Sequence, residues 1–214
     1  FTLFMVGGFI NSINIIDGYN GLALGYSILV LLAMAYVANA LGDDLVLQLS
    51  LMLISSLFGL FLFNFPFGKI FMGDGGAYFV GFMLSVIGLM LGIRNDEVSH
   101  WFILLLFIYP LYETAFSIYR KKIVRGVPVS QPDGYHLHML IYKRVVKCKA
   151  LKNNKIMCNS MTSPYVWALS LVGIIPAVVW YNNQTVLIIW AFIFMATYTI
   201  IYRRIVHFKF KFKK

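Results

Sequence analysis

Seven apolar stretches constrain this chain more than any other feature of its sequence. They cover residues 1–16, 22–41, 49–67, 76–93, 101–119, 165–181 and 186–202. A helix needs about 20 mostly apolar residues to cross the hydrocarbon core of a bilayer. Only 12% of the residues are charged, whereas a soluble domain has about 25%. The sequence therefore predicts an all-α fold, a polytopic transmembrane helix bundle with about seven spans.

The basic residues fall almost entirely on one side of the predicted membrane. Seventeen of the 18 Lys and Arg residues lie in connections that alternate to the same side, mainly in loop 120–163 and tail 203–214. Because Lys and Arg accumulate on the cytoplasmic side of membrane proteins, we expect a bacterial inner-membrane protein whose C-terminus is cytoplasmic. The same asymmetry accounts for the net charge of +10 without a nucleic-acid partner.

We expect one transmembrane domain over residues 1–214, with a basic cytoplasmic loop at 120–163 inside it. Phe1 lies within an apolar stretch, so the first span looks shortened. This predicts that the chain is the C-terminal part of a longer protein.

Part of the basic loop has a helical pattern. Residues 136–147 place their apolar side chains near one face, which fits a helix lying on the membrane surface about as well as a solvated basic loop. Cys148 and Cys158 follow in the same loop and match no metal-site spacing. We expect them to be free thiols in a reducing cytosol.

Three polar residues mark the cytoplasmic end of the first span. Asn11, Asn14 and Asp17 are three positions apart, so they lie along one side of a helix. Polar groups in a membrane segment are costly and indicate function, although amides can also join two helices. Behind them, Gly18 allows close approach of the backbone, and Asn20 can both donate and accept hydrogen bonds.

A second polar segment, Lys69-Ile-Phe-Met-Gly-Asp-Gly-Gly-Ala-Tyr78, precedes the fourth span. Its single carboxylate, Asp74, stands among glycines where a helix begins. A helix N-terminus attracts anions such as phosphate, and an Asp beside phosphate can hold Mg²⁺ through oxygen. The alternative is an ordinary helix cap, which taken alone is the stronger interpretation. Lys69 and Phe71 are further candidate substrate contacts in this segment.

The third polar segment is Asp133-Gly-Tyr-His-Leu-His138 in the basic loop. His136 and His138 can donate to phosphate oxygens near neutral pH, although surface histidines are often inert. A zinc site is disfavoured because no further His or Cys stands at ligand spacing. Arg125 precedes them in Arg-Gly-Val-Pro and is the one nearby cation that we single out for substrate binding.

The three segments fall on the same predicted face of the membrane. Together they offer carboxylates for a metal ion, amides for a polar ligand and cations for phosphates. Such a set suits phosphoryl transfer, where the protein mainly positions groups and neutralises charge. Because the site borders the membrane, we expect a membrane lipid as one substrate. Glu113 is the one acidic residue well within a span, and its sequence context assigns it no role.

These motifs resemble those of the polyprenyl-phosphate N-acetylhexosamine-1-phosphate transferases of glycosyltransferase family 4. Asn-Ser-Ile-Asn-Ile-Ile-Asp-Gly-Tyr-Asn-Gly-Leu-Ala, Phe-Met-Gly-Asp-Gly-Gly-Ala and Asp-Gly-Tyr-His-Leu-His are similar to three of that family's motifs, in the same order. The His-x-His pattern looks closer to the branch that initiates O-antigen and other surface glycans, including lipopolysaccharide, than to the phospho-N-acetylmuramoyl-pentapeptide branch.

The resemblance implies a Mg²⁺-dependent reaction, with Mn²⁺ as an alternative, in which a UDP-N-acetylhexosamine transfers its sugar 1-phosphate to undecaprenyl phosphate and UMP leaves. It implies that Asp74 is the Mg²⁺ ligand and that Asn14 and Asp17 lie near the diphosphate. It also implies uracil contacts and sugar-phosphate contacts, and it allows a homodimer. The residues implied for these contacts are Asn20 and Phe71 for uracil, and His136 and His138 for the sugar phosphate.

The chain departs from the family pattern at three points. Met139 stands where a third His is frequent, and Asn20 where many members have Asp. The family's Asp-Asp motif on an earlier loop is absent, so a chain consisting of these residues alone is expected to be inactive. The competing hypotheses are a transporter or channel, whose polar site would lie near the bilayer midplane, and an inactive relic. The donor sugar is not specified by any residue pattern in loop 120–163.

Overall fold

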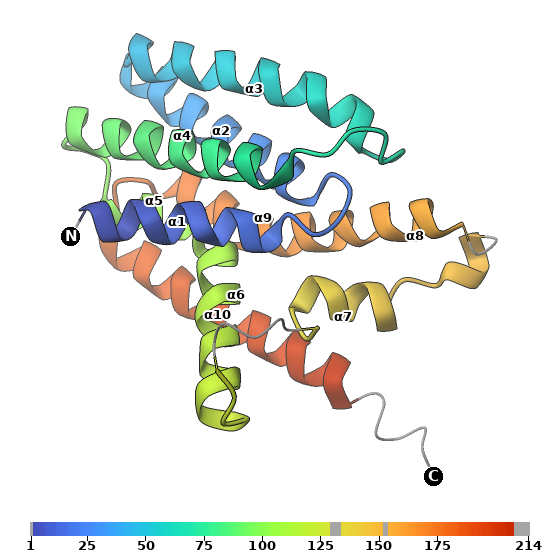
Figure 1. Cartoon of the computed structure of the whole chain (residues 1–214). Coiled ribbons are helices and arrows are strands. Elements are labelled where there is room, and N and C mark those ends of the chain that lie inside the picture. Colours follow the sequence, from blue (N-terminus) through green and yellow to red (C-terminus); the bar gives the residue numbers. More distant parts are fainter. Residues whose placement is uncertain (1, 129–133, 152–153, 208–214) are drawn as a thin grey trace.

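The computed structural model describes residues 2–128, 134–151 and 154–207, and its elements there are all helices (Figure 1). Asp133 of the third motif and the tail beyond residue 207 lie outside this part of the chain. The elements are α1 (Thr2–Ile16), α2 (Leu22–Leu41), α3 (Asp44–Asn64), α4 (Gly73–Arg94), α5 (His100–Leu106), α6 (Ile108–Tyr119), the π-helix η1 (Arg120–Val124), α7 (Leu137–Arg144), the 3₁₀-helix η2 (Cys148–Leu151), α8 (Lys155–Ser160), α9 (Thr162–Val179) and α10 (Gln184–His207).

The structure confirms the all-α, membrane-spanning fold class, and its span count roughly fits the expected seven. Five helical segments of the described chain are long and apolar enough to cross a bilayer: α2, α3, α4, α8 with α9, and α10. The expected span at 101–119 is instead two helices, α5 and α6, that meet at an angle of 70°. Counting this bent pair as one span makes six, and α1 is a shorter apolar helix.

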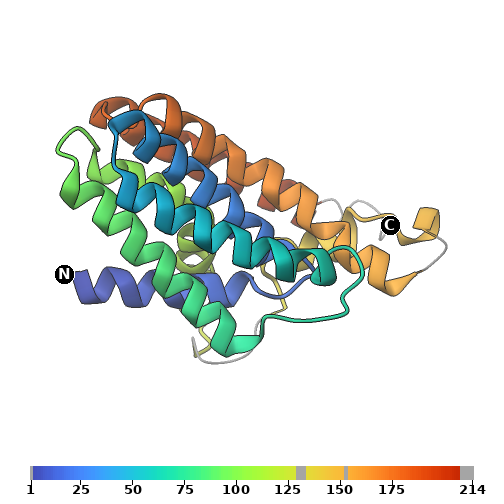
Figure 2. The ribbon, with the colours of Figure 1, turned by 90° about the horizontal axis from the view of Figure 1, so that it is seen from above.

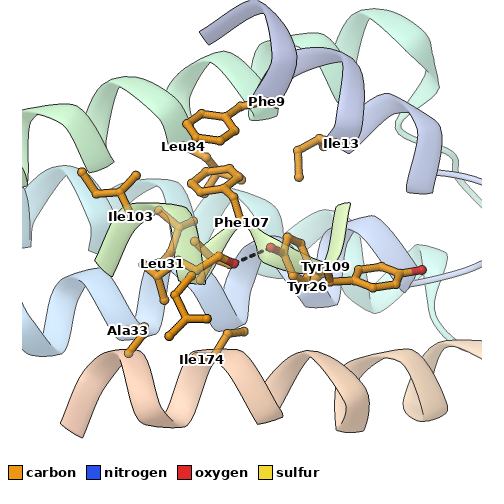
Figure 3. Close-up of a cluster of buried hydrophobic side chains, with 14 of the residues drawn as sticks. Phe9, Ile13, Tyr26, Leu31, Ala33, Leu84, Ile103, Phe107, Tyr109 and Ile174 are labelled. Carbon is orange, nitrogen blue, oxygen red and sulfur yellow. Dashed lines mark hydrogen bonds between the residues drawn. The ribbon is translucent and has the colours of Figure 1, made fainter. Parts of the chain in front are cut away.

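The bend between α5 and α6 follows from Pro110. In a continuous helix the N–H of residue 110 would donate to the carbonyl of Leu106, but proline has no N–H. The hydroxyl of Tyr26, on α2, donates to this carbonyl at 2.5 Å instead (Figure 3). A buried helix break is stable in a membrane protein when a neighbouring helix satisfies the freed group. The span expected at 101–119 is therefore bent at its proline.

The most buried helix is α2, which contacts α3, α4 and α9 (Figure 2). Beside it, α1 and α4 approach so closely that a Cβ added to Gly81 would stand 2.8 Å from the Cα of Ile10. The ring of Phe9 stacks on that of Phe107, with centroids 4.3 Å apart (Figure 3). These contacts set the position of α1 relative to α4 and to the break between α5 and α6. The first two polar motifs lie at the end of α1 and the start of α4.

An ion pair joins the α2–α3 loop to the end of α4, at the end of the bundle away from the three motifs. Arg94, the one basic residue predicted on that side, places its Nε 2.9 Å from Oδ2 of Asp43. Asn95 donates to the same carboxylate, and the N–H of Val46 donates to its other oxygen. Hydrogen bonds from Arg94 hold the pKa of Asp43 below its usual value. The loop between α2 and α3 is thereby fastened to the end of α4.

The basic loop is more structured than a linker. Helix α7 lies within the predicted amphipathic stretch, and Leu137, Leu140 and Ile141 are buried. Because α7 contacts α9 and α10, its apolar face packs on protein and does not cover the membrane surface as expected. The alternative of a solvated basic loop is wrong for these residues.

The expectation of free cysteines is also wrong. Cys148, in η2, and Cys158, in α8, form a disulfide with their Cα atoms 5.5 Å apart. Helix α8 contacts η2, which brings the two cysteines together. The prediction rested on the redox state of the compartment and had no information on this contact.

Candidate active site

The segments that carry the polar motifs gather at one end of the bundle. In Figures 1 and 2 the loop after α1, the loop between α3 and α4, and helices α7 and α8 all lie at the end away from the N-terminus. The connections α2–α3, α4–α5 and α9–α10 lie at the other end. The alternation predicted from the charge pattern therefore brings the three motifs to a common end.

Asn14, Asp17 and Asp74 form the first cluster at this end. The side-chain amide of Asn14 donates to Oδ1 of Asp74 across 3.2 Å, which joins the end of α1 to the first turn of α4. Asp17 is half-buried just beyond α1. Its pKa is raised from 3.8 to about 6, first by burial and second by the negative charge of Asp74. Asn11 is exposed one turn earlier on α1.

This carboxylate pair can accept a divalent cation. A cation between Asp17 and Asp74 would offset the repulsion that raises the pKa of Asp17. Mg²⁺ typically takes one or two protein carboxylates and completes its shell with water or substrate phosphates. No group of three or more His, Cys, Asp or Glu side chains suited to a metal occurs in the described residues. The pair therefore fits Mg²⁺ and does not form an all-protein cage.

The loop that follows α1 connects this cluster to the histidines. Gly18 faces His138 so closely that a Cβ on Gly18 would lie 3.7 Å from its Nε2. The ring of Tyr19 meets His138 edge-on at 5.6 Å and lies 5.3 Å from the ring of Tyr142. Burial, with the adjacent Tyr142, raises the pKa of Tyr19 to about 12. The first and third motifs are thus in contact, as their predicted shared face requires.

Glu113 orients the histidine pair. Its carboxylate is fully buried on α6 and lies 3.0 Å from Nδ1 of His136. The backbone N–H of Leu137, in the first turn of α7, donates to both oxygens of Glu113 at 3.1 and 3.3 Å. Sequence reasoning assigned Glu113 no role. A lone carboxylate within a span was the available signal, but its partner lies 23 residues away in a loop.

The two imidazole rings have different environments. They stack in parallel with centroids 5.3 Å apart, yet His138 is fully buried whereas His136 is partly exposed. Nδ1 of His138 lies 3.4 Å from the hydroxyl of Tyr109, and its Nε2 has no hydrogen-bond partner among the described residues. Burial lowers the pKa of His138 to about 4. His138 is therefore neutral near pH 7.

Asn20 is a structural member of the site. It is 5% exposed, and its amide donates to the hydroxyl of Ser160 at 3.1 Å. Its backbone N–H donates to the side chain of Asn159, and its carbonyl accepts from the hydroxyl of Ser163. These bonds fasten the loop after α1 to α8 and α9. The expected role of Asn20 as a uracil contact stays a prediction.

Asn64 is a second positioning residue that the sequence did not reveal. Its side chain accepts a hydrogen bond from the N–H of Gly21 at 2.5 Å and donates to the carbonyl of Ile70 at 2.7 Å. A single side chain at the end of α3 therefore holds both motif-bearing loops. An Asn beside Phe and Pro at the end of an apolar span was the only signal, and it did not identify the partners.

The remaining candidates lie around this framework. Phe71 is 68% exposed. The ammonium of Lys69 lies over the ring of Phe67, 5.6 Å from its centroid. The guanidinium of Arg125 lies 4.7 Å from the ring centroid of Tyr135. Arg125 lines a cavity with η1 and α10, so the structure does not bring it into the cluster of Asn14 and Asp74.

Comparison with known proteins gives a consistent set of matches. Residues 1–92 match the model of glycosyl transferase family 4. The chain is 38% identical over 139 residues to the probable undecaprenyl-phosphate N-acetylglucosaminyl 1-phosphate transferase of Bacillus subtilis (strain 168). This alignment covers 64% of the chain and 38% of the Bacillus protein. It is 32% identical over 181 residues to the phospho-N-acetylmuramoyl-pentapeptide-transferase of Streptococcus equi subsp. zooepidemicus. This alignment covers 81% of the chain and 50% of the Streptococcus protein.

The chain spans 38 to 50% of the length of these relatives. No solved structure matches it.

Proposed function

We propose, from the match of residues 1–92 to the model of glycosyl transferase family 4, that the protein transfers an N-acetylhexosamine 1-phosphate from a UDP-sugar to undecaprenyl phosphate. An acceptor phosphate oxygen bonds to the β-phosphorus, and the bond from that phosphorus to the bridging oxygen breaks to release UMP. The observation that carries the proposal is the polar cluster of Asn14, Asp17 and Asp74, which lies beside the histidine pair at one end of a membrane bundle.

Asp74 and Asp17 are the proposed metal-binding carboxylates. Mg²⁺, or Mn²⁺ in its place, would supply positive charge to a diphosphate that carries several negative charges. Asn14 holds Asp74 through its amide and restricts the direction of that carboxylate. The repulsion between the two carboxylates favours a cation at this place over an apolar or anionic group.

The histidines are proposed to have separate roles. His136 is partly exposed, and Glu113 holds its Nδ1, so its Nε2 is the ring nitrogen left for the ligand. His138 is buried and neutral, so it supports the loop at Gly18 and Tyr19 and does not act as a cation. This division refines the expectation that both histidines contact the sugar phosphate.

Phe71 suits the uracil contact because its ring is largely exposed and can stack on a base. Lys69, two residues earlier, is exposed and can reach an anionic group of the same ligand. We propose that the backbone of Gly18 also contacts the ligand, whereas the amide of Asn20 donates to Ser160 and its uracil contact stays a prediction.

Release of UMP from a UDP-sugar by the purified full-length protein tests the reaction. We expect release that requires undecaprenyl phosphate and stops when EDTA removes Mg²⁺. Asp74→Asn should abolish release and leave thermal unfolding intact. Asp96→Asn is the matched control, because Asp96 is an exposed carboxylate at the opposite end of the bundle. Normal turnover by Asp74→Asn would remove Asp74 from the metal site.

Two donors distinguish the branches of the family. We propose the surface-glycan branch, with a product such as O-antigen, because the chain has His-Leu-His-Met where the phospho-N-acetylmuramoyl-pentapeptide branch has a run of histidines. UDP-N-acetylglucosamine and UDP-N-acetylmuramoyl-pentapeptide, supplied separately, report this choice through UMP. Release with the second donor alone would contradict it.

The alternatives require different measurements. A transporter would move substrate across proteoliposomes without releasing UMP, and its polar site would lie near the midplane. An inactive relic would bind neither substrate. We also propose that the motif end and the C-terminus face the cytoplasm, which a reporter fused after residue 207 would test.

A further inference from the structure

The disulfide between Cys148 and Cys158 lies at the motif end of the bundle, outside the three motifs themselves. It joins η2 to α8, and these two helices contact each other. Besides α9, into which α8 continues, η2 is the helix that α8 contacts most. Residues 154–156, where α8 begins, are exposed, whereas Cys158 is only 1% exposed. The link to η2 is therefore a main support of the first turn of α8.

The segment before the disulfide leads directly to the histidine helix. Only residues 145–147 separate α7 from η2, and the N–H of Val146 donates to the carbonyl of Ile141 in α7. Helix α7 in turn reaches the loop after α1, because His138 lies against Gly18. A displacement of η2 is therefore passed on to the helix that supports this loop.

The segment after the disulfide holds the same loop through hydrogen bonds. Asn159 and Ser160 directly follow Cys158 in α8. The side chain of Asn159 accepts from the backbone N–H of Asn20 at 2.7 Å, and the hydroxyl of Ser160 accepts from the Asn20 amide at 3.1 Å. The hydroxyl of Ser160 also donates to the carbonyl of Pro66, between α3 and α4. The two residues next to Cys158 thus reach both motif-bearing loops.

These contacts form a closed ring. It runs from the loop after α1 through His138 to α7 and η2, crosses the disulfide to α8, and returns through Asn159 to the loop. The disulfide is the covalent cross-link in this ring, and the other links are hydrogen bonds and ring contacts. Disulfides of cytosolic proteins are usually transient and redox-sensing or catalytic. The end of the bundle that carries this disulfide is the one proposed to face the cytoplasm.

We propose that Cys148 and Cys158 form a redox-sensitive clasp, whose disulfide form holds the loop after α1 and whose dithiol form loosens it. Cys148 is partly exposed, so its sulfur is the one that an external dithiol attacks. A thiolate of that dithiol bonds to Sγ of Cys148, the bond between the two cysteines breaks, and Cys158 takes up a proton. The second thiol of the reductant then displaces Cys148, which is protonated. The cysteines are reduced to two thiols, and the external dithiol is oxidised to its own disulfide.

Control of sugar-phosphate transfer by this clasp rests on the proposed function. Asp17 stands at the start of the loop that the clasp holds, and its carboxylate must keep its place beside Asp74 to share a metal ion. The dithiol form should therefore release UMP about fivefold more slowly than the disulfide form, which is the lower end of usual coupling between sites. The clasp itself does not depend on the substrate and has a readout of its own.

Hydrogen exchange tests the clasp without an activity assay. The full-length protein, purified in detergent, is equilibrated with reduced or oxidised dithiothreitol before exchange. The amide of Asn20 should exchange about tenfold faster in the reduced protein, because its acceptor Asn159 is held less firmly. The amide of Val46 is the matched control, since its acceptor Asp43 lies at the opposite end of the bundle. Its exchange should be the same in both states.

The double variant Cys148→Ser/Cys158→Ser identifies the cysteines responsible. Its Asn20 amide should exchange at the fast rate with either reagent, and its UMP release should not respond to the reductant. Equal exchange of Asn20 in oxidised and reduced wild-type protein would overturn the proposal. A redox response that persists in the double variant would do the same, as would a pair that alkylation and mass spectrometry find reduced in the oxidised reagent.

Activity is measured on the same samples. Equal UMP release in both redox states, with a difference in Asn20 exchange, would refute control of transfer by the clasp. Absence of UMP release in both states would refute the proposed function, and the exchange of Asn20 would still decide whether the clasp exists.

Discussion

Glutamine in place of Glu113 should destabilise the protein even though the two side chains have the same shape. Glu113 is fully buried and accepts hydrogen bonds from two donors, the ring of His136 and the backbone of Leu137. Glutamine has one acceptor oxygen, and its other terminal atom is a donor. Both donors therefore lose a charged acceptor, even where the ring of His136 changes its tautomer to keep the contact.

The expected loss is about 1.5–3 kcal/mol, the usual worth of one hydrogen bond to a charged group. Glu97→Gln is a matched control, because Glu97 is the chain's other glutamate and is exposed in the α4–α5 loop. Its free energy of unfolding should change by less than about 0.5 kcal/mol. Equilibrium unfolding of both variants in mixed micelles gives the comparison.

The same substitution should change the tautomer of His136. In the wild type, Nδ1 carries the proton because the carboxylate of Glu113 accepts from it. The glutamine amide can donate to Nδ1 instead, which moves the proton to Nε2. Ring ¹⁵N chemical shifts of His136 report this exchange. Equal stability of the two glutamine variants, together with an unchanged tautomer, would refute the assigned hydrogen bonds.

Three further results are expected. The pKa of His138 is lowered from 6.5 to about 4, so the unfolded state binds more protons than the folded state between these pH values. The free energy of unfolding should therefore fall as the pH drops from 6.5 to 4, by up to about 3 kcal/mol. His138→Gln, measured at the same pH values, is the reference that lacks this loss. Gly81→Ala should push α1 away from α4, lower the free energy of unfolding by about 1–3 kcal/mol and slow UMP release. Gly59→Ala, where the added methyl group enters open space, should leave the stability and the UMP release unchanged. Mg²⁺ should raise the thermal midpoint of the wild type and not of the Asp17→Asn/Asp74→Asn double variant, and an equal rise in both would exclude the pair as its site.

Helix positions could be predicted from the sequence because each span is a long apolar run between polar residues. The predicted ends of α2, at residues 22 and 41, agree with the structure. The break at Phe107 was not predicted, although Pro110 was visible. A proline in a membrane helix can kink it slightly or break it, and the outcome depends on whether a partner such as Tyr26 donates a hydrogen bond to the freed carbonyl.

The site was predictable in its parts and not in its internal contacts. Charge alternation placed three motifs at one end, and Asn14 and Asp74 are hydrogen-bonded there. The roles of Glu113 and Asn64 were missed, because long-range partners leave no local pattern. The partners of Asn20 were missed for the same reason: its motif is local, but Asn159 and Ser160 lie far along the chain.

The bonds from Asn20 to residues 159–163 have a consequence for biosynthesis. The segment that matches the family, residues 1–92, leaves the ribosome well before α8 and α9 exist, because synthesis runs from the N-terminus. Until those helices form, the loop after α1 lacks the three hydrogen bonds that Asn20 makes with residues 159–163. The loop that carries Asp17 is then not held in its final position. The nascent protein therefore passes through a membrane-inserted stage that has its motifs and lacks a formed site.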